Sequence, residues 1–173
     1  MNLIFIFSFL ICFLSYAIHT WATYLETNKK TSNNKTVEKI ISTIIHLGYV
    51  AWVFMIFSDP VRGNFSNYVA MPVGLLIGIT GTVLFALSVI DKKGYHDLNY
   101  LVKTGIYSKI RHPMYLGIIL IHIGFPIAWQ SILTLASAII WIPQILLWKY
   151  WEDKYLEKKF GNEYIGYKKK TIF

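Results

Sequence analysis

The sequence has few charged residues and a single cysteine. Of its 173 residues, 15% are charged and 55% are hydrophobic, whereas soluble domains carry about 25% charged residues. This deficit argues against a soluble globular domain. No G-x-G-x-x-G motif lies at a strand-to-helix junction, which argues against a dinucleotide-binding α/β fold. The lone Cys12 lies inside an apolar run, so no disulfide framework is expected, and no metal site is predicted.

Long uncharged runs take the place of the missing charges. A membrane helix needs about 20 apolar residues, and the run 113–148 is long enough for two passes joined by a tight turn around Pro126–Ser131. The sequence therefore predicts an all-α integral membrane protein, one domain over residues 1–173. Its five expected spans are roughly 3–25, 40–58, 68–90, 115–129 and 131–150.

The basic residues predict the orientation of these spans. With five spans, 16 of the 17 Lys and Arg residues fall on one side and only Arg62 on the other. The positive-inside rule then places the N terminus outside and the C terminus in the cytoplasm. Because these basic residues flank apolar runs, no nucleic-acid binding is expected. Met1–Leu25 is expected to be a span and not a cleaved signal peptide, since it lacks a basic n-region and an A-x-A site.

Glycine and histidine residues within the spans suggest packing roles. Gly74, Gly78 and Gly81 form a G-x-x-x-G face, which predicts that the third helix packs closely on a neighbour. His19 and His46 lie near span ends and are expected to be packing or interface residues.

Polar residues capable of chemistry gather in two segments that the last hairpin brings together. The first ends in Arg111-His112-Pro113, where the proline is suited to start a helix, and the second begins with Glu152-Asp153. We expect Arg111 and His112 to face this acidic pair. Lys109 and Arg111 could also be simple topology anchors, with Glu152 as a salt-bridge partner for one of them.

The order and spacing of these residues form a recognisable pattern over roughly the last 75 residues. The pattern is Leu101-Val102-x-x-Gly105-x-Tyr107, then Arg111-His112-Pro113-x-Tyr115-x-Gly117, then after the hairpin Glu152-Asp153-x-x-Leu156-x-x-x-Phe160-Gly161-x-Glu163-Tyr164-x-x-Tyr167. It resembles the isoprenylcysteine carboxyl methyltransferase family and its phospholipid methyltransferase relatives. These are small integral-membrane enzymes that use S-adenosylmethionine.

The resemblance implies a division of the chain and a set of site residues. Residues 1–90 would supply three membrane helices and residues 91–173 the catalytic portion. The positions implied to contact the cofactor are Leu101, Val102, Tyr107, His112, Pro113, Met114, Tyr115 and Glu152. Arg111, His112 and Glu152 are the candidate catalytic residues. His112 with Arg111 could hold the cofactor carboxylate, and Glu152 its ammonium.

One position departs from the family pattern. Isoprenylcysteine enzymes have a basic residue one helical turn before the acidic residue, where it is implicated in holding the substrate carboxylate. Here Trp148 occupies that position, and Lys149 is its only basic neighbour. A step of one residue turns a helical side chain by about 100°. Trp148 and Lys149 are therefore the candidate substrate-binding residues.

The expected activity is methyl transfer from S-adenosylmethionine to a lipid-like or prenylated acceptor at the cytoplasmic interface. Membrane lipids are the expected partners, with no obligate protein partner inferred. The membrane would be the plasma or inner membrane in a bacterium and the endoplasmic reticulum in a eukaryote. Two alternatives stay open: an NADPH-dependent reductase of the sterol-reductase kind, which has a similar R-H-P segment, and a non-enzymatic lipid-binding or assembly protein.

Overall fold

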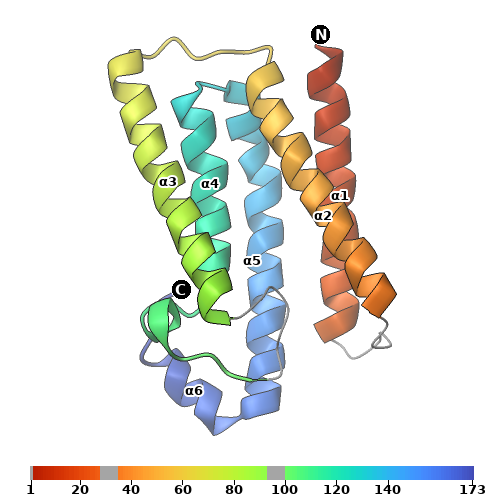
Figure 1. Cartoon of the computed structure of the whole chain (residues 1–173), viewed down its shortest axis with the longest axis vertical. Coiled ribbons are helices and arrows are strands. Elements are labelled where there is room, and N and C mark those ends of the chain that lie inside the picture. The colour runs from red at the N-terminus through yellow and green to blue at the C-terminus, as the bar shows by residue number, and fades with distance from the viewer. Residues whose placement is uncertain (1, 28–34, 93–99) are drawn as a thin grey trace.

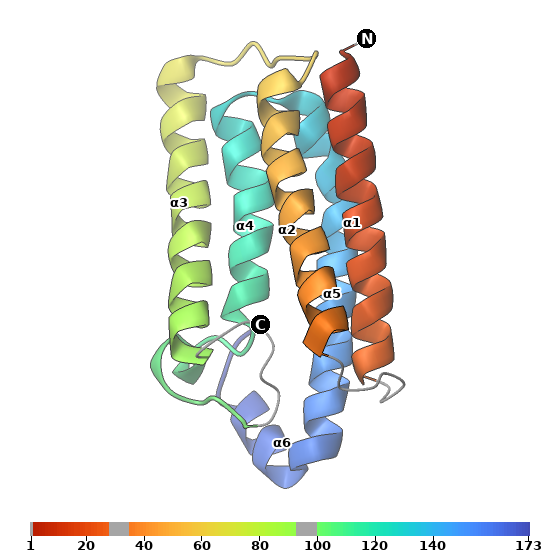
Figure 2. The same cartoon turned by 45° about the vertical axis from the view of Figure 1, so that its right-hand side comes forward.

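The protein is a bundle of helices (Figures 1 and 2). The computed structural model describes residues 2–27, 35–92 and 100–173. Its elements are α1 (Leu3–Thr27), α2 (Lys35–Ser58), α3 (Asn67–Lys92), the 3₁₀ helix η1 (Gly105–Ser108), α4 (Pro113–Ala128), α5 (Ile132–Phe160) and α6 (Asn162–Lys168). The described residues form no β-strand, only two isolated bridges. The predicted all-α fold is confirmed.

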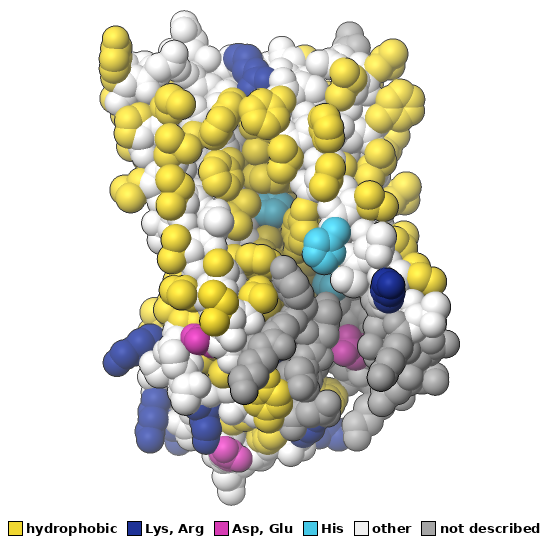
Figure 3. Space-filling view, in the orientation of Figure 1, with side chains coloured by type: hydrophobic (Ala, Val, Ile, Leu, Met, Phe, Trp, Pro, Cys, Tyr) yellow, Lys and Arg dark blue, Asp and Glu magenta, His cyan; other side chains and the backbone are white. Residues whose placement is uncertain are grey.

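Two helix pairs flank a long fifth helix. Helix α1 packs against α2, α3 packs against α4, and α5 contacts α1, α2 and α4. The short helices η1 and α6 lie at one end of the bundle, where α5 extends past the other helices (Figure 1). The N terminus lies at the opposite end (Figure 2). Lys and Arg side chains gather mainly at the end that carries α6 (Figure 3).

Four helices are long and apolar enough to cross a membrane: α1, α2 from Lys39, α3 and α5. Their positions match four of the five expected spans. The other expected span, 115–129, corresponds to α4, which is apolar but has only 16 residues. At 1.5 Å per residue, α4 is about 24 Å long, somewhat shorter than the roughly 30 Å hydrocarbon layer.

The last long helix continues past its predicted end. The sequence placed this end near residue 150, but α5 runs to Phe160. Charged residues after Tyr150 are compatible with a helix outside a hydrocarbon environment, so the loss of hydropathy ends the apolar span without ending the helix. The helix ends at Gly161, whose φ of +54° lies in a region that L-residues rarely adopt. The extension places Glu152 and Asp153 within a regular helix.

The glycine face of α3 packs directly on α4, as predicted. A Cβ atom at Gly74 would collide with the backbone at Gly124 and Ala128, and one at Gly81 would come 2.7 Å from the carbonyl oxygen of Gly117. Only residues without a Cβ allow the two backbones to approach this closely. This contact fixes the position of α3 relative to α4, and with it the loop that leads into the site.

Arg62 holds the two turns at the end of the bundle far from α6. Its guanidinium donates to the carbonyl oxygens of Phe57 and Trp129, both within 3.0 Å, and to Ser131 Oγ at 2.7 Å. Ser131 lies in the tight turn expected between α4 and α5, where Gln130 has a φ of +53°. Arg62 therefore has a structural function at this end of the bundle.

Candidate active site

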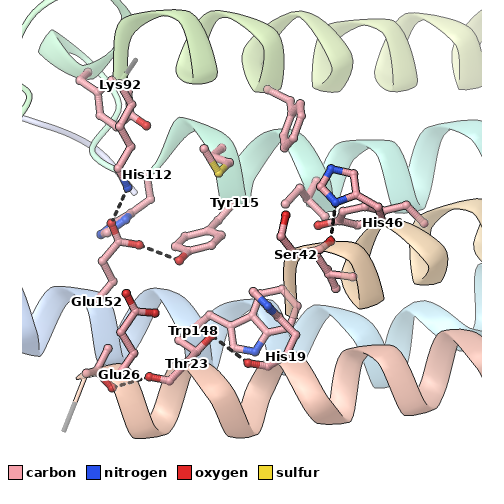
Figure 4. Close-up of a pocket in the computed structure, with 17 residues that line it drawn as sticks. His19, Thr23, Glu26, Ser42, His46, Lys92, His112, Tyr115, Trp148 and Glu152 are labelled. Carbon is pink, nitrogen blue, oxygen red and sulfur yellow. Dashed lines mark hydrogen bonds and ion pairs between the residues drawn. The ribbon is translucent and has the colours of Figure 1, made fainter. Parts of the chain in front are cut away.

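A polar pocket lies between the two helix pairs, toward the end that carries α6 (Figure 4). Helices α1 and α2 form one side, and α3, η1, α4 and α5 form the other. The lining residues are His19, Thr23, Glu26, Thr27, Ser42, Ile45, His46, Tyr49, Phe85, Lys92, Tyr107, His112, Met114, Tyr115, Ile118, Trp148 and Glu152. Acidic, basic and aromatic groups therefore share a space enclosed by the bundle.

Glu152 is held at the wall of this pocket by two donors. Lys92 Nζ lies 3.2 Å from Oε1, and the Tyr115 hydroxyl donates to Oε2 at 2.6 Å. The Lys92 and Glu152 side chains are only 10% and 13% exposed. A carboxylate buried to this extent is stable when a cation and a hydrogen-bond donor compensate for lost water. The negative charge of Glu152 is therefore maintained inside the protein.

The neighbouring residue Asp153 forms a separate cluster. His112 Nε2 lies 2.7 Å and Arg111 Nε 3.1 Å from Asp153 Oδ1, and the Tyr164 hydroxyl donates to the same oxygen. Lys149 Nζ lies 3.5 Å from the other oxygen, Oδ2. Arg111 and His112 were expected to face the Glu152–Asp153 pair, and within that pair Asp153 is the partner of both.

Local backbone features position the Arg111-His112 segment. Pro113 is the first residue of α4, and His112 precedes it as the N-cap residue. On the other side, the Arg111 backbone N–H donates to the Ile172 carbonyl at 2.9 Å, and the Ile172 N–H donates to the Lys109 carbonyl at 3.0 Å. The helix start and this parallel bridge together determine where the two side chains point.

Glycine 105 positions the turn that carries Tyr107. Its φ is +58°, and a Cβ there would collide with the Asp91 carboxylate. That carboxylate accepts a 2.7 Å hydrogen bond from the Ile106 N–H. The Tyr167 hydroxyl in turn donates to the Tyr107 carbonyl at 2.7 Å. The turn η1 is thereby attached both to α3 and to α6.

A smaller pocket adjoins the first on the side of η1 and α6. It is lined by Lys92, Tyr100, Leu101, Val102, Tyr107, Arg111, Glu152, Leu156, Tyr164 and Tyr167. Three residues line both pockets: Lys92, Tyr107 and Glu152. The Lys92–Glu152 ion pair therefore lies where the two pockets meet.

The tyrosines of this end are neutral hydrogen-bond donors. Burial, opposed by the nearby Arg111 guanidinium, raises the pKa of Tyr167 to about 12. Burial and the charge of Glu152 raise the pKa of Tyr107, and burial with the hydrogen bond to Asp153 raises that of Tyr164. At neutral pH these phenols keep their protons, so they can donate hydrogen bonds and offer aromatic surface but cannot act as bases.

An apolar groove lies beside the polar pocket, between α2 and α4 (Figure 3). Its volume is about 370 Å³, and its lining residues are Tyr49, Trp52, Val53, Ile56, Phe57, Phe85, Ile118, Ile121, His122, Phe125 and Trp129. It shares Tyr49, Phe85 and Ile118 with the polar pocket. A molecule with a polar head and an apolar chain could therefore occupy both.

Comparison with known proteins gives this site a context. The model of the phospholipid methyltransferase family matches residues 64–163, more than half of the chain. The chain belongs to this membrane methyltransferase family. It is also 43% identical over 77 residues to the protein-S-isoprenylcysteine O-methyltransferase of Saccharomyces cerevisiae. That match covers 41% of this chain and 30% of the yeast protein. No solved structure gives a significant match.

The family resemblance inferred from the sequence is thus confirmed, and the structure brings most of the candidate residues together. Tyr107, His112, Met114, Tyr115, Trp148 and Glu152 line the polar pocket, and Leu101, Val102, Tyr107, Arg111 and Glu152 line the adjoining one. Two candidates line neither. Pro113 is fully buried at the start of α4, and Lys149 points toward Asp153 and the Phe173 ring.

Other residues of the site were not identified from the sequence. Lys92 was counted only among the basic residues that set the topology, and Asp153 was named only as part of the acidic pair. His19 and His46 were expected to be packing or interface residues, and both line the pocket. A signal existed for Lys92, because it is the first basic residue after the uncharged run 63–90. Nothing in the spacing identified the residues of α1 and α2.

Among the described residues, no group of three or more His, Cys, Asp or Glu side chains is placed to hold a metal ion. The chemistry available in this family member is that of buried charges, hydrogen-bond donors and aromatic rings. These groups can bind and orient two molecules next to each other.

Proposed function

We propose that the protein transfers a methyl group from S-adenosylmethionine to a lipid-like or prenylated acceptor at the membrane interface. Carboxyl O-methylation of the isoprenylcysteine type is the most similar known activity, because the yeast relative bears that name. The observation that carries the proposal is the arrangement of the cavities: a pocket containing the buried Glu152 shares a wall with an apolar groove. A charged donor and an apolar acceptor can meet there.

The side chains around Glu152 fit the chemistry of the cofactor. S-adenosylmethionine supplies an electrophilic methyl group on a sulfonium, and its amino-acid end carries an ammonium and a carboxylate. Glu152 would bind the ammonium, and Lys92 with Arg111 the carboxylate. The rings of Tyr107 and Tyr115 offer surface for a sulfonium or for adenine, and Leu101 and Val102 line the adjoining pocket with apolar surface.

Each remaining candidate has a role in this proposal that follows from its position. His112 would contact the cofactor from the pocket wall, and Met114 from the first turn of α4. Pro113 would act by starting that helix. Trp148 would line the acceptor side, while Lys149 would act through Asp153.

Methyl transfer is an in-line displacement, so most of the protein's contribution is positioning and exclusion of water. A carboxylate acceptor attacks without a base, whereas an amine must first lose a proton. Glu152 is fixed by Lys92, and His112 is fixed by Asp153. These ion pairs support a role for both residues in positioning the reactants and not in removing a proton.

The first test measures cofactor affinity by calorimetry on detergent-purified protein. Glu152→Gln keeps the size and one acceptor oxygen but removes the charge, so we expect affinity for S-adenosylmethionine to fall by about tenfold or more. Glu157→Gln is the matched control, since Glu157 lies on the same helix, pairs with Lys168 and lines none of the three cavities. Unchanged affinity in folded Glu152→Gln would overturn the role of Glu152.

The second test asks whether methyl transfer occurs. Membranes containing the protein are incubated with methyl-labelled S-adenosylmethionine, and the lipid fraction is then treated with alkali. Label in an amphiphile supports the proposal, and alkali distinguishes a methyl ester from an N-methyl product. Binding of NADPH with no methyl transfer would instead indicate the reductase alternative.

The proposal includes a topology of five spans, with the C terminus and the site on the cytoplasmic side. Cysteines placed at Arg62 and Lys168 should then react with an impermeant thiol reagent from opposite sides of the membrane. The native Cys12 is fully buried and gives little background. Equal reactivity of both positions from one side would contradict an odd number of spans.

A further inference from the structure

We propose that the outward face of α5, where the helix leaves the bundle, binds the phosphate groups of anionic phospholipids in the leaflet next to α6. The site consists of Tyr150, Lys154 and Lys158, and we call it the lysine stripe. Its partner is the surrounding bilayer, so the inference does not depend on the proposed methyl transfer.

The lysine stripe continues the side of α5 that points away from the bundle. At about 100° per residue, Leu147, Tyr150, Lys154 and Lys158 lie within about 80° of one another around the helix axis. Leu147 and Tyr150 are 38% and 55% exposed, and both lysines are exposed as well. Leu156 lies on the opposite side of the helix and is buried. The two lysines therefore face the lipid around the bundle.

The depth of the lysine stripe matches the headgroup region of a bilayer. Helix α5 begins at Ile132. For a helix that enters the hydrocarbon at its first residue, a layer of roughly 30 Å ends after about 20 residues, near residue 151. Lys154 then lies about 5 Å and Lys158 about 10 Å beyond the hydrocarbon, where the headgroup region is roughly 5–8 Å thick. Long lysine side chains reach lipid phosphates from such positions.

The acidic residues nearby already have partners within the protein. The segment 149–170 has seven lysines and four acidic residues. Besides the two adjacent acids of the site, Glu157 pairs with Lys168 at 2.6 Å and Glu163 with Lys103 at 2.7 Å. Within the described part of the chain, no carboxylate pairs with either lysine of the stripe. Their positive charge is therefore available to an anion outside the protein, and a membrane surface rich in anionic lipid supplies one.

Tyr150 adds an aromatic group at the boundary. Lys154 Nζ lies 5.7 Å from the centre of the Tyr150 ring, a distance at which an aromatic face attracts a cation. Tyrosine is typical of the interface between hydrocarbon and headgroups, and its hydroxyl is a further donor for phosphate. Because the stripe is continuous with an apolar, outward-facing surface, it favours a phosphate attached to acyl chains over free phosphate.

The experiment measures lipid binding to the detergent-purified protein by native mass spectrometry. Phosphatidylglycerol, which is anionic, is compared in mixed micelles with phosphatidylcholine, which is zwitterionic and has the same acyl chains. We expect the protein to bind phosphatidylglycerol more tightly. Equal affinities for the two lipids would overturn the inference. Displacement of phosphatidylglycerol by an equal concentration of soluble glycerol 3-phosphate would also overturn it, because the site would then bind free phosphate.

A double variant, Lys154→Gln with Lys158→Gln, tests the stripe itself. We expect phosphatidylglycerol affinity to fall about five- to twentyfold, because each lysine near a membrane surface contributes a several-fold attraction. Phosphatidylcholine affinity should stay unchanged. The charge-reversing pair Lys154→Glu with Lys158→Glu should remove the preference for phosphatidylglycerol entirely.

The matched control is Lys103→Gln with Lys168→Gln. It removes the same net charge from lysines that already have acidic partners, so phosphatidylglycerol affinity should fall by less than about twofold. Equal losses in the control and the stripe variant would assign the attraction to net charge and overturn the inference. An unchanged affinity in the stripe variant would overturn it as well.

Discussion

Glu152 and Asp153 are adjacent in sequence, yet they belong to two different regions of the molecule. Glu152 faces the pocket between the helix pairs and has two protein donors, Lys92 and Tyr115. Asp153 faces the segment before α4 and the short helix α6. It pairs with Arg111, His112 and Lys149 and accepts a hydrogen bond from the Tyr164 hydroxyl. One carboxylate borders a cavity, and the other is enclosed by the chain.

The difference shows how one turn of helix can serve binding and folding together. The Asp153 cluster joins α5, α6 and the Arg111-His112 segment, so the Asp153 carboxylate itself binds only side chains of the protein. One oxygen of the Glu152 carboxylate pairs with Lys92, and the other accepts a hydrogen bond from the Tyr115 hydroxyl. Both oxygens can also interact with a bound molecule. We therefore expect changes at Asp153 to affect stability and changes at Glu152 to affect binding.

The largest expected effect is on stability. Asp153→Ala leaves Arg111 and His112 without their buried acceptor, and we expect it to lower the free energy of unfolding by about 3 kcal/mol. Denaturant titration of the purified protein measures this loss, with Glu157→Gln as the control. A stable Asp153→Ala protein with weak cofactor binding would erase the distinction between the two regions.

Tyr164→Phe tests the same cluster with a smaller change. The substitution removes one hydroxyl donor to Asp153 and keeps the ring, so we expect a loss of about 1 kcal/mol in the same titration. Tyr155→Phe is the matched control, since Tyr155 lines none of the three cavities. Tyr164 also lines the adjoining pocket, but the substitution keeps its ring, so the distinction is sharpened if cofactor affinity stays within about twofold in Tyr164→Phe.

The smallest effect is expected on the pocket side. Tyr115→Phe removes the 2.6 Å hydrogen bond to Glu152 Oε2. We expect cofactor affinity to fall by roughly three- to fivefold, because the Glu152 carboxylate is then held by Lys92 alone and is less precisely oriented. The melting temperature should fall by less than it does in Tyr164→Phe. A larger loss of stability than of affinity would assign Glu152 to the structural region as well.

The sequence predicted the helices well because apolar runs are local signals. Charged residues delimit α1, α2 and α3 to within a few residues, and the glycines of α3 predicted its close packing. The end of α5 was missed because the prediction followed hydropathy, which falls after Tyr150, while helix propensity persists to the Gly161 stop.

Most of the predicted site residues lie together in the structure, but the sequence did not predict which side chains pair with one another. Spacing along the chain brings Arg111 and His112 near the start of the extension of α5, but it does not say which of two adjacent acids they reach. The two side chains point about 100° apart around the helix, and the packing of α5 decides which of them faces the Arg111-His112 segment. Contributions from α1 and α2, such as Glu26 and His46, depend on contacts distant in sequence.

The glycine contact between α3 and α4 has a mechanical consequence for the bundle. At Gly74 and Gly81 the backbone of α3 contacts the backbone of α4. No side chain can rotate aside there, so this seam, the line of contact between α3 and α4, opens only if the two helices separate. The border between α2 and α4 is formed by side chains such as Phe57 and Phe125, which can change rotamer. The bundle therefore has one rigid seam and one adjustable seam, and in the proposed function the adjustable seam would be where the acceptor enters.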